Sequence, residues 1–250
     1  TGLLGSVVTT GVSRETGNAA LQAAFGMPPE TQISQFDPRN VSAGEAASLS
    51  AILAASSKMN YLGYIAAPLF GMETEALRKL LDTEIAGRIA SLTPVQQNGS
   101  YVVQFDLSDK DVIDSVLTSV QSNSGASVNA EHRGAVAALI AELNQKADEV
   151  LANGTGDPIS GLAPLKAIAQ TDLPDQIRKM LAGTITPEEL VATGIAPFLA
   201  AKEVPIHIVQ VEDQILEEEQ VVVPLYFENV NSVSQPYTVQ VQVDNPELLP

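Results

Sequence analysis

Hydrophobic residues recur with two different periods along this chain, and the change falls near residue 203. Before it, apolar positions lie three and four residues apart, the spacing of an amphipathic helix. After it, apolar and polar residues alternate, as they do in a strand with one buried face. The pattern predicts an α+β protein, with a mainly helical domain over residues 1–203 and an antiparallel β segment over residues 204–250.

Clear start and stop signals divide the helical part. Helices are expected over residues 18–25, 46–55, 73–92, 109–120, 130–151 and 173–181. Another begins at Thr186, which is followed by a first-turn proline and then by a glutamate three residues on. A short strand over 101–107 and a loop rich in glycine and proline over 154–164 are also expected. No repeat of fixed period is present, so the pattern favours a bundle or array over a solenoid.

The last fifty residues carry two apolar rows. One row consists of Val221, Val223, Leu225 and Phe227, and the other of Tyr237, Val239, Val241 and Val243. Burying one such side chain is worth about 1.5–3 kcal/mol, and a single sheet would leave one of its faces exposed. We therefore predict that these eight residues form an interface with the helical domain, with further residues of the same chain or with another molecule.

Composition narrows the function classes. The chain has 250 residues with a net charge of −17, which argues against nucleic acid and anionic membranes as partners. It has no cysteine, which excludes disulfides, thiolate metal sites and thiol nucleophiles. The longest apolar run, residues 61–70, is shorter than the roughly 20 residues of a membrane span and contains Gly63 and Pro68.

Catalytic motifs are missing from the sequence. The two histidines, His132 and His207, lie far apart, and no Gly-x-Ser-x-Gly elbow accompanies them. Gly154-Thr155-Gly156 lacks the third glycine of a dinucleotide-binding loop. Paired carboxylates could serve glycoside hydrolysis, but a chain with 4% aromatic residues and no tryptophan offers few surfaces for stacking a sugar. We expect a non-enzymatic protein, with an enzyme that uses an unrecognised carboxylate site as one alternative.

One acidic constellation suggests a ligand. Glu212, Asp213 and Glu217 lie close together in the sequence, and Asp244 follows in the last strand. Calcium takes six to eight oxygen ligands from such carboxylates, so calcium is the one cofactor that this pattern suggests. The other interpretation, and the favoured one, is a solvated turn whose charges prevent edge-to-edge strand pairing.

Both ends of the chain resemble parts of large bacterial proteins. The stretches EVPIHIVQVEDQILEEEQVVVPLYFENV and YTVQVQVDNPELLP resemble the first half of an immunoglobulin- or cadherin-like repeat of bacterial surface proteins. The matching features are Pro205, Asp213-Gln214, 217–219, Pro224-Leu225 and 244–250. The stretch GLLGSVVTTGVSRETGNAALQAAFGMPPETQISQFDP resembles a segment of large, secreted, calcium-associated proteins, although the Gly-Asp-rich calcium nonapeptides of those proteins are absent.

This resemblance implies a bacterial extracellular or cell-surface location and an incomplete immunoglobulin-like sandwich at the C-terminal end. It implies a structural or adhesive, adhesin-like module whose partners are further repeats of the same chain or neighbouring subunits. Calcium would bind where cadherin-like modules join. A second hypothesis is a subunit of an extracellular filament or surface layer, in which a neighbour's strand completes the sandwich.

Overall fold

The structure is a computed structural model, and it describes most of the chain between residues 46 and 202. The described residues are 7, 11, 13–25, 27, 31, 33, 46–91, 95–97, 100–102, 105–153, 158–202, 207–210 and 226–228. The chain divides into two compact units, Thr1–Leu199 and Ala200–Pro250. The boundary between residues 203 and 204 that the sequence suggests stays a prediction.

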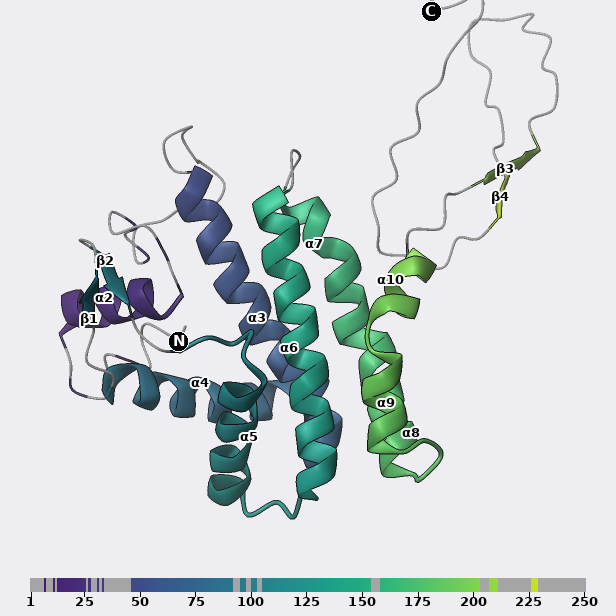
Figure 1. Ribbon diagram of the computed structural model, residues 1–250, viewed down its shortest axis with the longest axis horizontal. Coiled ribbons are helices and arrows are strands. Elements are labelled where there is room, and N and C mark those ends of the chain that lie inside the picture. Colours follow the sequence, from purple (N-terminus) through teal and green to yellow (C-terminus); the bar gives the residue numbers. More distant parts are fainter. Residues whose placement is uncertain are drawn as a thin grey trace, which may run out of the picture. The chain divides into compact units, whose positions relative to one another are not determined.

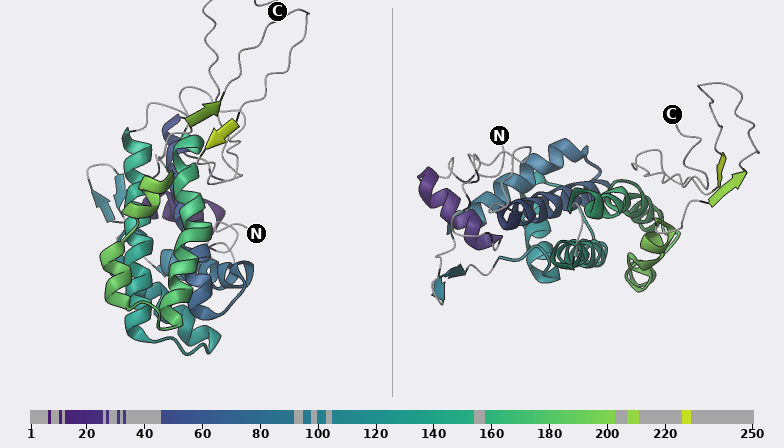
Figure 2. Two further views of the ribbon diagram at one scale, coloured as in Figure 1. Left: turned by 90° about the vertical axis from the view of Figure 1, so that its right-hand side faces the viewer. Right: turned by 90° about the horizontal axis from the view of Figure 1, so that it is seen from above.

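Helices dominate the described residues. They are α2 (Arg14–Ala24), α3 (Ala46–Phe70), α4 (Thr74–Ser91), α5 (Lys110–Ser124), α6 (Ala130–Asn153), α7 (Pro158–Ala167), the π-helical turn η2 (Ile168–Asp172), α8 (Leu173–Leu181), α9 (Pro187–Thr193) and α10 (Ala196–Lys202). Helix α3 packs against α4, α6, α7 and α8, and α5 packs against α4 and α6. Figures 1 and 2 show α6 beside the rod formed by α7 and α8.

Several helix ends follow directly from the sequence. Thr186 and Glu189 form the expected capping box of α9, in which the Thr186 hydroxyl accepts from Glu189 N at 3.1 Å and the glutamate accepts from Thr186 N at 2.8 Å. The cap of α5 is Asp109, one residue after the expected Ser108, and its side chain accepts from Asp111 N at 2.7 Å. Helix α5 ends at Gly125, whose φ of 70° is left-handed.

Burial explains why one helix is longer than predicted and why another forms in a predicted loop. Helix α3 continues to Phe70 instead of ending near residue 55, because Tyr61, Leu62 and Ile65 are almost completely buried. Helix α7 replaces the expected loop over 154–164 from Pro158 onward, with its leucines 162 and 165 in the core. Proline is tolerated at a first helical position. Tertiary packing outweighs weak local helix propensity at both places.

The core of the helical unit is one contiguous cluster of buried side chains. The stripe expected on α4 is confirmed, since Leu77, Leu81, Ile85 and Ile89 are all buried. The expected helices over 73–92, 130–151 and 173–181 are confirmed to within two residues at each end.

The expected α+β class is wrong for the described residues. Helices dominate the part of the chain that the structure describes, so its fold is all-α. Among the described residues, strand β1 (Val95–Gln97) pairs only with β2 (Ser100–Val102), and β3 (His207–Gln210) only with β4 (Tyr226–Glu228). Two ribbons of such short strands form no immunoglobulin-like or cadherin-like sandwich. Alternating polarity indicates a strand with one buried face, but it does not show that a second sheet covers that face.

Candidate functional site

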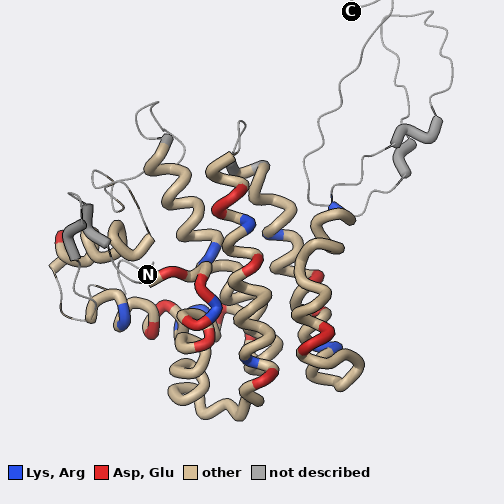
Figure 3. The backbone as a smooth tube through the Cα atoms, in the orientation of Figure 1, with Lys and Arg blue, Asp and Glu red and all other residues tan. Residues whose placement is uncertain are grey.

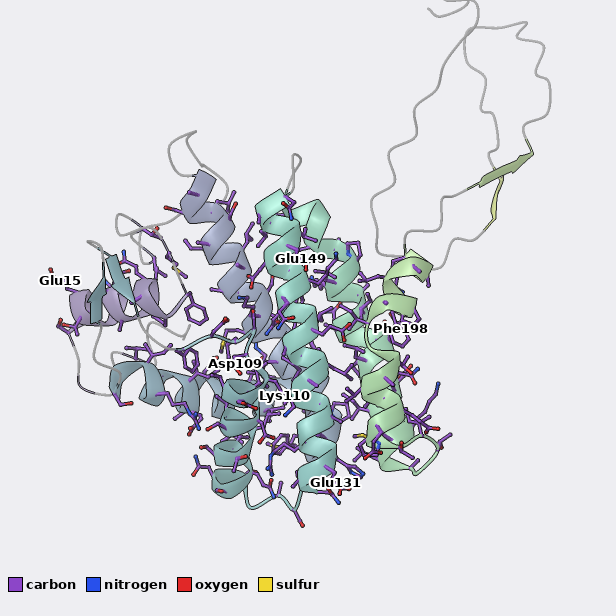
Figure 4. The ribbon with its side chains drawn as sticks, in the orientation of Figure 1. Glu15, Asp109, Lys110, Glu131, Glu149 and Phe198 are labelled. Atoms are coloured by element: carbon purple, nitrogen blue, oxygen red, sulfur yellow. The ribbon has the colours of Figure 1, made fainter. Side chains whose placement is uncertain are left out.

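An open hollow of about 620 Å³ lies between the chain that precedes α5 and one face of α6. Its lining consists of Asp106, Ser108, Asp109, Lys110, Gln145, Asp148 and Glu149. The three residues from α6 are spaced three and four apart, which places them on one side of that helix. Figure 4 labels Asp109 and Lys110 at the start of α5 and Glu149 on α6. We call residues 105–109, which form the other wall, the strap.

A largely buried lysine contacts two of the carboxylates that line this hollow. Lys58 of α3 places its Nζ 2.7 Å from Asp148 Oδ2 and 3.8 Å from Asp106 Oδ1. Its side chain is 12% exposed, against 45% for Asp148 and 66% for Asp106. A charged side chain with so little exposure is stabilised by a counterion. Lys58 therefore joins three segments: α3, α6 and the strap.

Hydrogen bonds hold the strap on α6. The Ser108 hydroxyl donates to Asp148 Oδ2 at 2.9 Å, and the Ser108 backbone N donates to Asp106 Oδ1 at 2.8 Å. On α6, the Gln145 side chain donates to the Ser108 carbonyl at 2.9 Å. The Asn144 side chain donates to the Leu107 carbonyl at 2.6 Å. Charge-assisted hydrogen bonds are stronger than neutral ones, so Asp148 is the centre of this network.

Apolar contacts anchor the strap as well. Phe105 and Leu107 are both buried in the core of the helical unit. The Phe105 ring meets the ring of Phe25 edge to face, with centroids 6.4 Å apart. The strap is thus held by two buried apolar side chains and by its hydrogen bonds to α6.

The Ser108 hydroxyl shares its acceptor with a lysine. Ser108 and Lys58 both donate to the same oxygen of Asp148, and Ser108 is only 7% exposed. A nucleophilic serine has to reach its substrate while a base holds its proton. In this arrangement the Ser108 hydroxyl is directed to a carboxylate that already pairs with a lysine.

Two arginines make similar links between other helices. Arg88 of α4 contacts Glu84 at 2.7 Å, the Ser115 hydroxyl at 2.9 Å, the Ser115 carbonyl at 2.8 Å and the Ser119 hydroxyl at 2.8 Å. It therefore ties α4 to α5. The Arg133 side chain of α6 donates to Asp114 Oδ1 and to Gln121 Oε1 on α5, both at 2.9 Å. The planar guanidinium suits such multiple contacts.

A carboxylate fixes the turn between α9 and α10. Glu142 Oε1 on α6 accepts from the backbone N of Ile195 at 3.2 Å. Gly194, just before it, has a φ of 58°, and a Cβ there would lie 2.9 Å from both oxygens of Glu142. Only glycine fits this position without strain.

Two ionisable groups outside the hollow have shifted pKa values. Burial raises the pKa of Tyr61 to about 12, although a hydrogen bond with Ser57 acts in the opposite direction. The Tyr61 hydroxyl donates to the Leu162 carbonyl at 3.4 Å. Burial also raises the pKa of Asp82 on α4, with nearby Arg78 acting against this shift. Both groups belong to the packing of the helices and neither lines the hollow.

The predicted calcium ligands cannot be placed. Glu212, Asp213, Glu217 and Asp244 lie outside the described residues. Within the described ranges, no group of three or more His, Asp or Glu side chains could hold a metal ion. The expectation of calcium association therefore has no support in this part of the chain.

Most of the predicted interface residues also lie outside the described residues. Val221, Val223, Leu225, Tyr237, Val239, Val241 and Val243 lie outside the described residues, and Phe227 is placed by its backbone alone, opposite Ile208 in the β3–β4 ribbon. Their role as an interface stays a prediction. None of the described helices combines the length and the apolar character that a membrane span requires.

Apart from Ser108 as a helix cap, the sequence patterns do not point to the residues around the hollow. One signal is nevertheless present. Lys58 is the one charged residue in the 25 residues of α3. A single charge in so apolar a helix indicates a buried cation with an acidic partner elsewhere in the chain. That partner, Asp148, is 90 residues away, and its identity depends on the tertiary fold.

Comparisons with protein-family models, with characterised proteins and with solved structures give no match to this chain. The proposed resemblance to adhesin-like bacterial proteins thus stays a prediction.

Proposed function

We propose that this chain is a non-enzymatic structural module whose helical unit serves as a rigid support. The observation that carries the proposal is the use of the polar groups around the hollow. Lys58, Ser108 and Asp148 are all engaged in holding the strap against α3 and α6.

The other charged links support the same function. Arg88 joins α4 to α5, Arg133 joins α6 to α5, and Glu142 joins α6 to the turn before α10. Each of these side chains connects its own helix to a different element. Such links between elements restrict their relative movement, which is the property that a structural module needs.

The resemblance to bacterial surface proteins adds a context to this proposal. It implies a module of a bacterial extracellular protein with a structural or adhesive role and with protein partners. This context rests on the residues quoted for the resemblance, and it does not include the immunoglobulin-like sandwich. The filament hypothesis depends on strand residues that lie outside the described ranges, so no described contact favours it.

The enzymatic alternative has one place where it can be tested, the hollow itself. In the full chain, Ser108→Ala removes a hydrogen bond that holds the strap, and Asp148→Asn removes the charge that accepts this bond and pairs with Lys58. Glu149→Gln is the matched control, because Glu149 lines the same hollow but contacts the exposed Lys146 instead of the strap. Urea unfolding, amide hydrogen exchange of residues 105–109 and turnover of ester, peptide and glycoside substrates are measured for each variant.

The structural proposal expects Ser108→Ala and Asp148→Asn to lower the unfolding free energy by about 1–2 kcal/mol and to speed exchange in the strap. The control stays within about 0.5 kcal/mol of the parent chain. The proposal is overturned by turnover that both strap variants lose and the control retains, with unfolding free energies unchanged.

A further inference from the structure

No further inference is drawn: the strongest candidate, the open hollow between the strap and α6 with the carboxylates of Asp106, Asp109, Asp148 and Glu149, is an acidic cluster that belongs to the site already described, and nothing else in the described residues indicates what ligand it would take.

Discussion

Lys58 shows how a single residue can connect distant parts of this chain. Its side chain is only 12% exposed, and its ammonium group reaches two carboxylates that line the hollow. Removing the charge leaves Asp148 with the hydrogen bond from the Ser108 hydroxyl. The loss therefore affects an anion that is itself half-buried.

We expect Lys58→Met to lower the free energy of unfolding by about 1–2 kcal/mol, less than the roughly 3–5 kcal/mol of a fully buried pair, because Asp148 retains access to water. Methionine keeps most of the length of the stem, so the change tests the charge and not the packing. Chemical denaturation provides the measurement. Lys110→Met, whose partner lies 3.8 Å away on an exposed surface, is the control and costs below about 1 kcal/mol. Equal effects of the two substitutions would contradict a central role for Lys58.

Tyr61 makes stability depend on alkaline pH. Its pKa rises from 10.0 to about 12 because the charged phenolate would be buried. The folded state thus favours the neutral phenol, and this contribution to stability is complete below pH 10 and lost as the pH rises through about 12.

We predict that Tyr61→Phe reduces this alkaline loss of stability. At neutral pH the variant loses about 0.5–1.5 kcal/mol, the usual value for one hydrogen bond, because the bond to the Leu162 carbonyl is gone. The measurement is the unfolding free energy at a series of alkaline pH values, together with the ultraviolet absorbance of phenolate. An unchanged pH dependence in the variant would show that other groups cause the alkaline loss.

At the scale of elements, side chains of α4 lie directly against Gly63 of α3. A Cβ added to Gly63 would lie 2.6 Å from Cγ of Arg78. That carbon is near the base of the arginine side chain, so relief requires a change in the Arg78 rotamer or a shift of the helices. The glycine within the apolar run of residues 61–70 does not interrupt the helix but lets two helices come together.

We predict that Gly63→Ala destabilises the protein by about 1–3 kcal/mol through overpacking, despite the better helix propensity of alanine. Gly87→Ala on α4 is the matched control, because no atom lies within 4 Å of the added Cβ there. That substitution stabilises the helix by about 0.5–1 kcal/mol. Thermal or urea unfolding of both variants tests the pair, and a stabilised Gly63→Ala would refute the close crossing.

The sequence predicts those elements that local signals specify. The Thr186 capping box, the apolar stripe of α4 and the bounds of α8 all come from contacts within a few residues. The extension of α3 beyond residue 55 and the existence of α7 come from burial against helices far along the chain. The alternation over 204–250 does not by itself predict a sandwich, since it does not specify what covers the apolar face.

The site is harder to predict than the elements. The neighbours of Ser108 predict a cap role for it, but in the structure Asp109 is the cap and Ser108 contacts Asp148 instead. Its partners on α6 follow some 40 residues later, in a helix whose rotation relative to the strap depends on the whole core. Spacing along the sequence carries no information on such a contact.

At the scale of the whole molecule, acidic residues exceed basic ones. The sequence has 30 Asp and Glu against 13 Lys and Arg, and Figure 3 shows the red segments outnumbering the blue ones along the helices. Repulsion among these charges opposes the compact state. The cross-links made by Lys58, Arg88 and Arg133 offset part of this repulsion locally.

Salt should therefore stabilise the protein. Raising sodium chloride from about 0.01 M to about 0.15 M shortens the screening length from roughly 30 Å to roughly 8 Å, which weakens long-range repulsion more than short ion pairs. We expect the unfolding temperature to rise over this range in a thermal scan. A lower unfolding temperature at the higher salt concentration would mean that the ion pairs outweigh the repulsion. In that case the decrease would be smaller in Lys58→Met, which lacks one of these pairs.

The position of α3 also affects how a newly made chain matures. Helix α3 packs against α4, α6, α7 and α8, and the last of these ends at Leu181. A ribosome adds about 5–20 residues per second, so roughly 110 residues of further synthesis take on the order of 5–20 s. For that time the apolar segment that becomes the centre of the helical unit lacks the helices that later bury it, and we expect it to be prone to association.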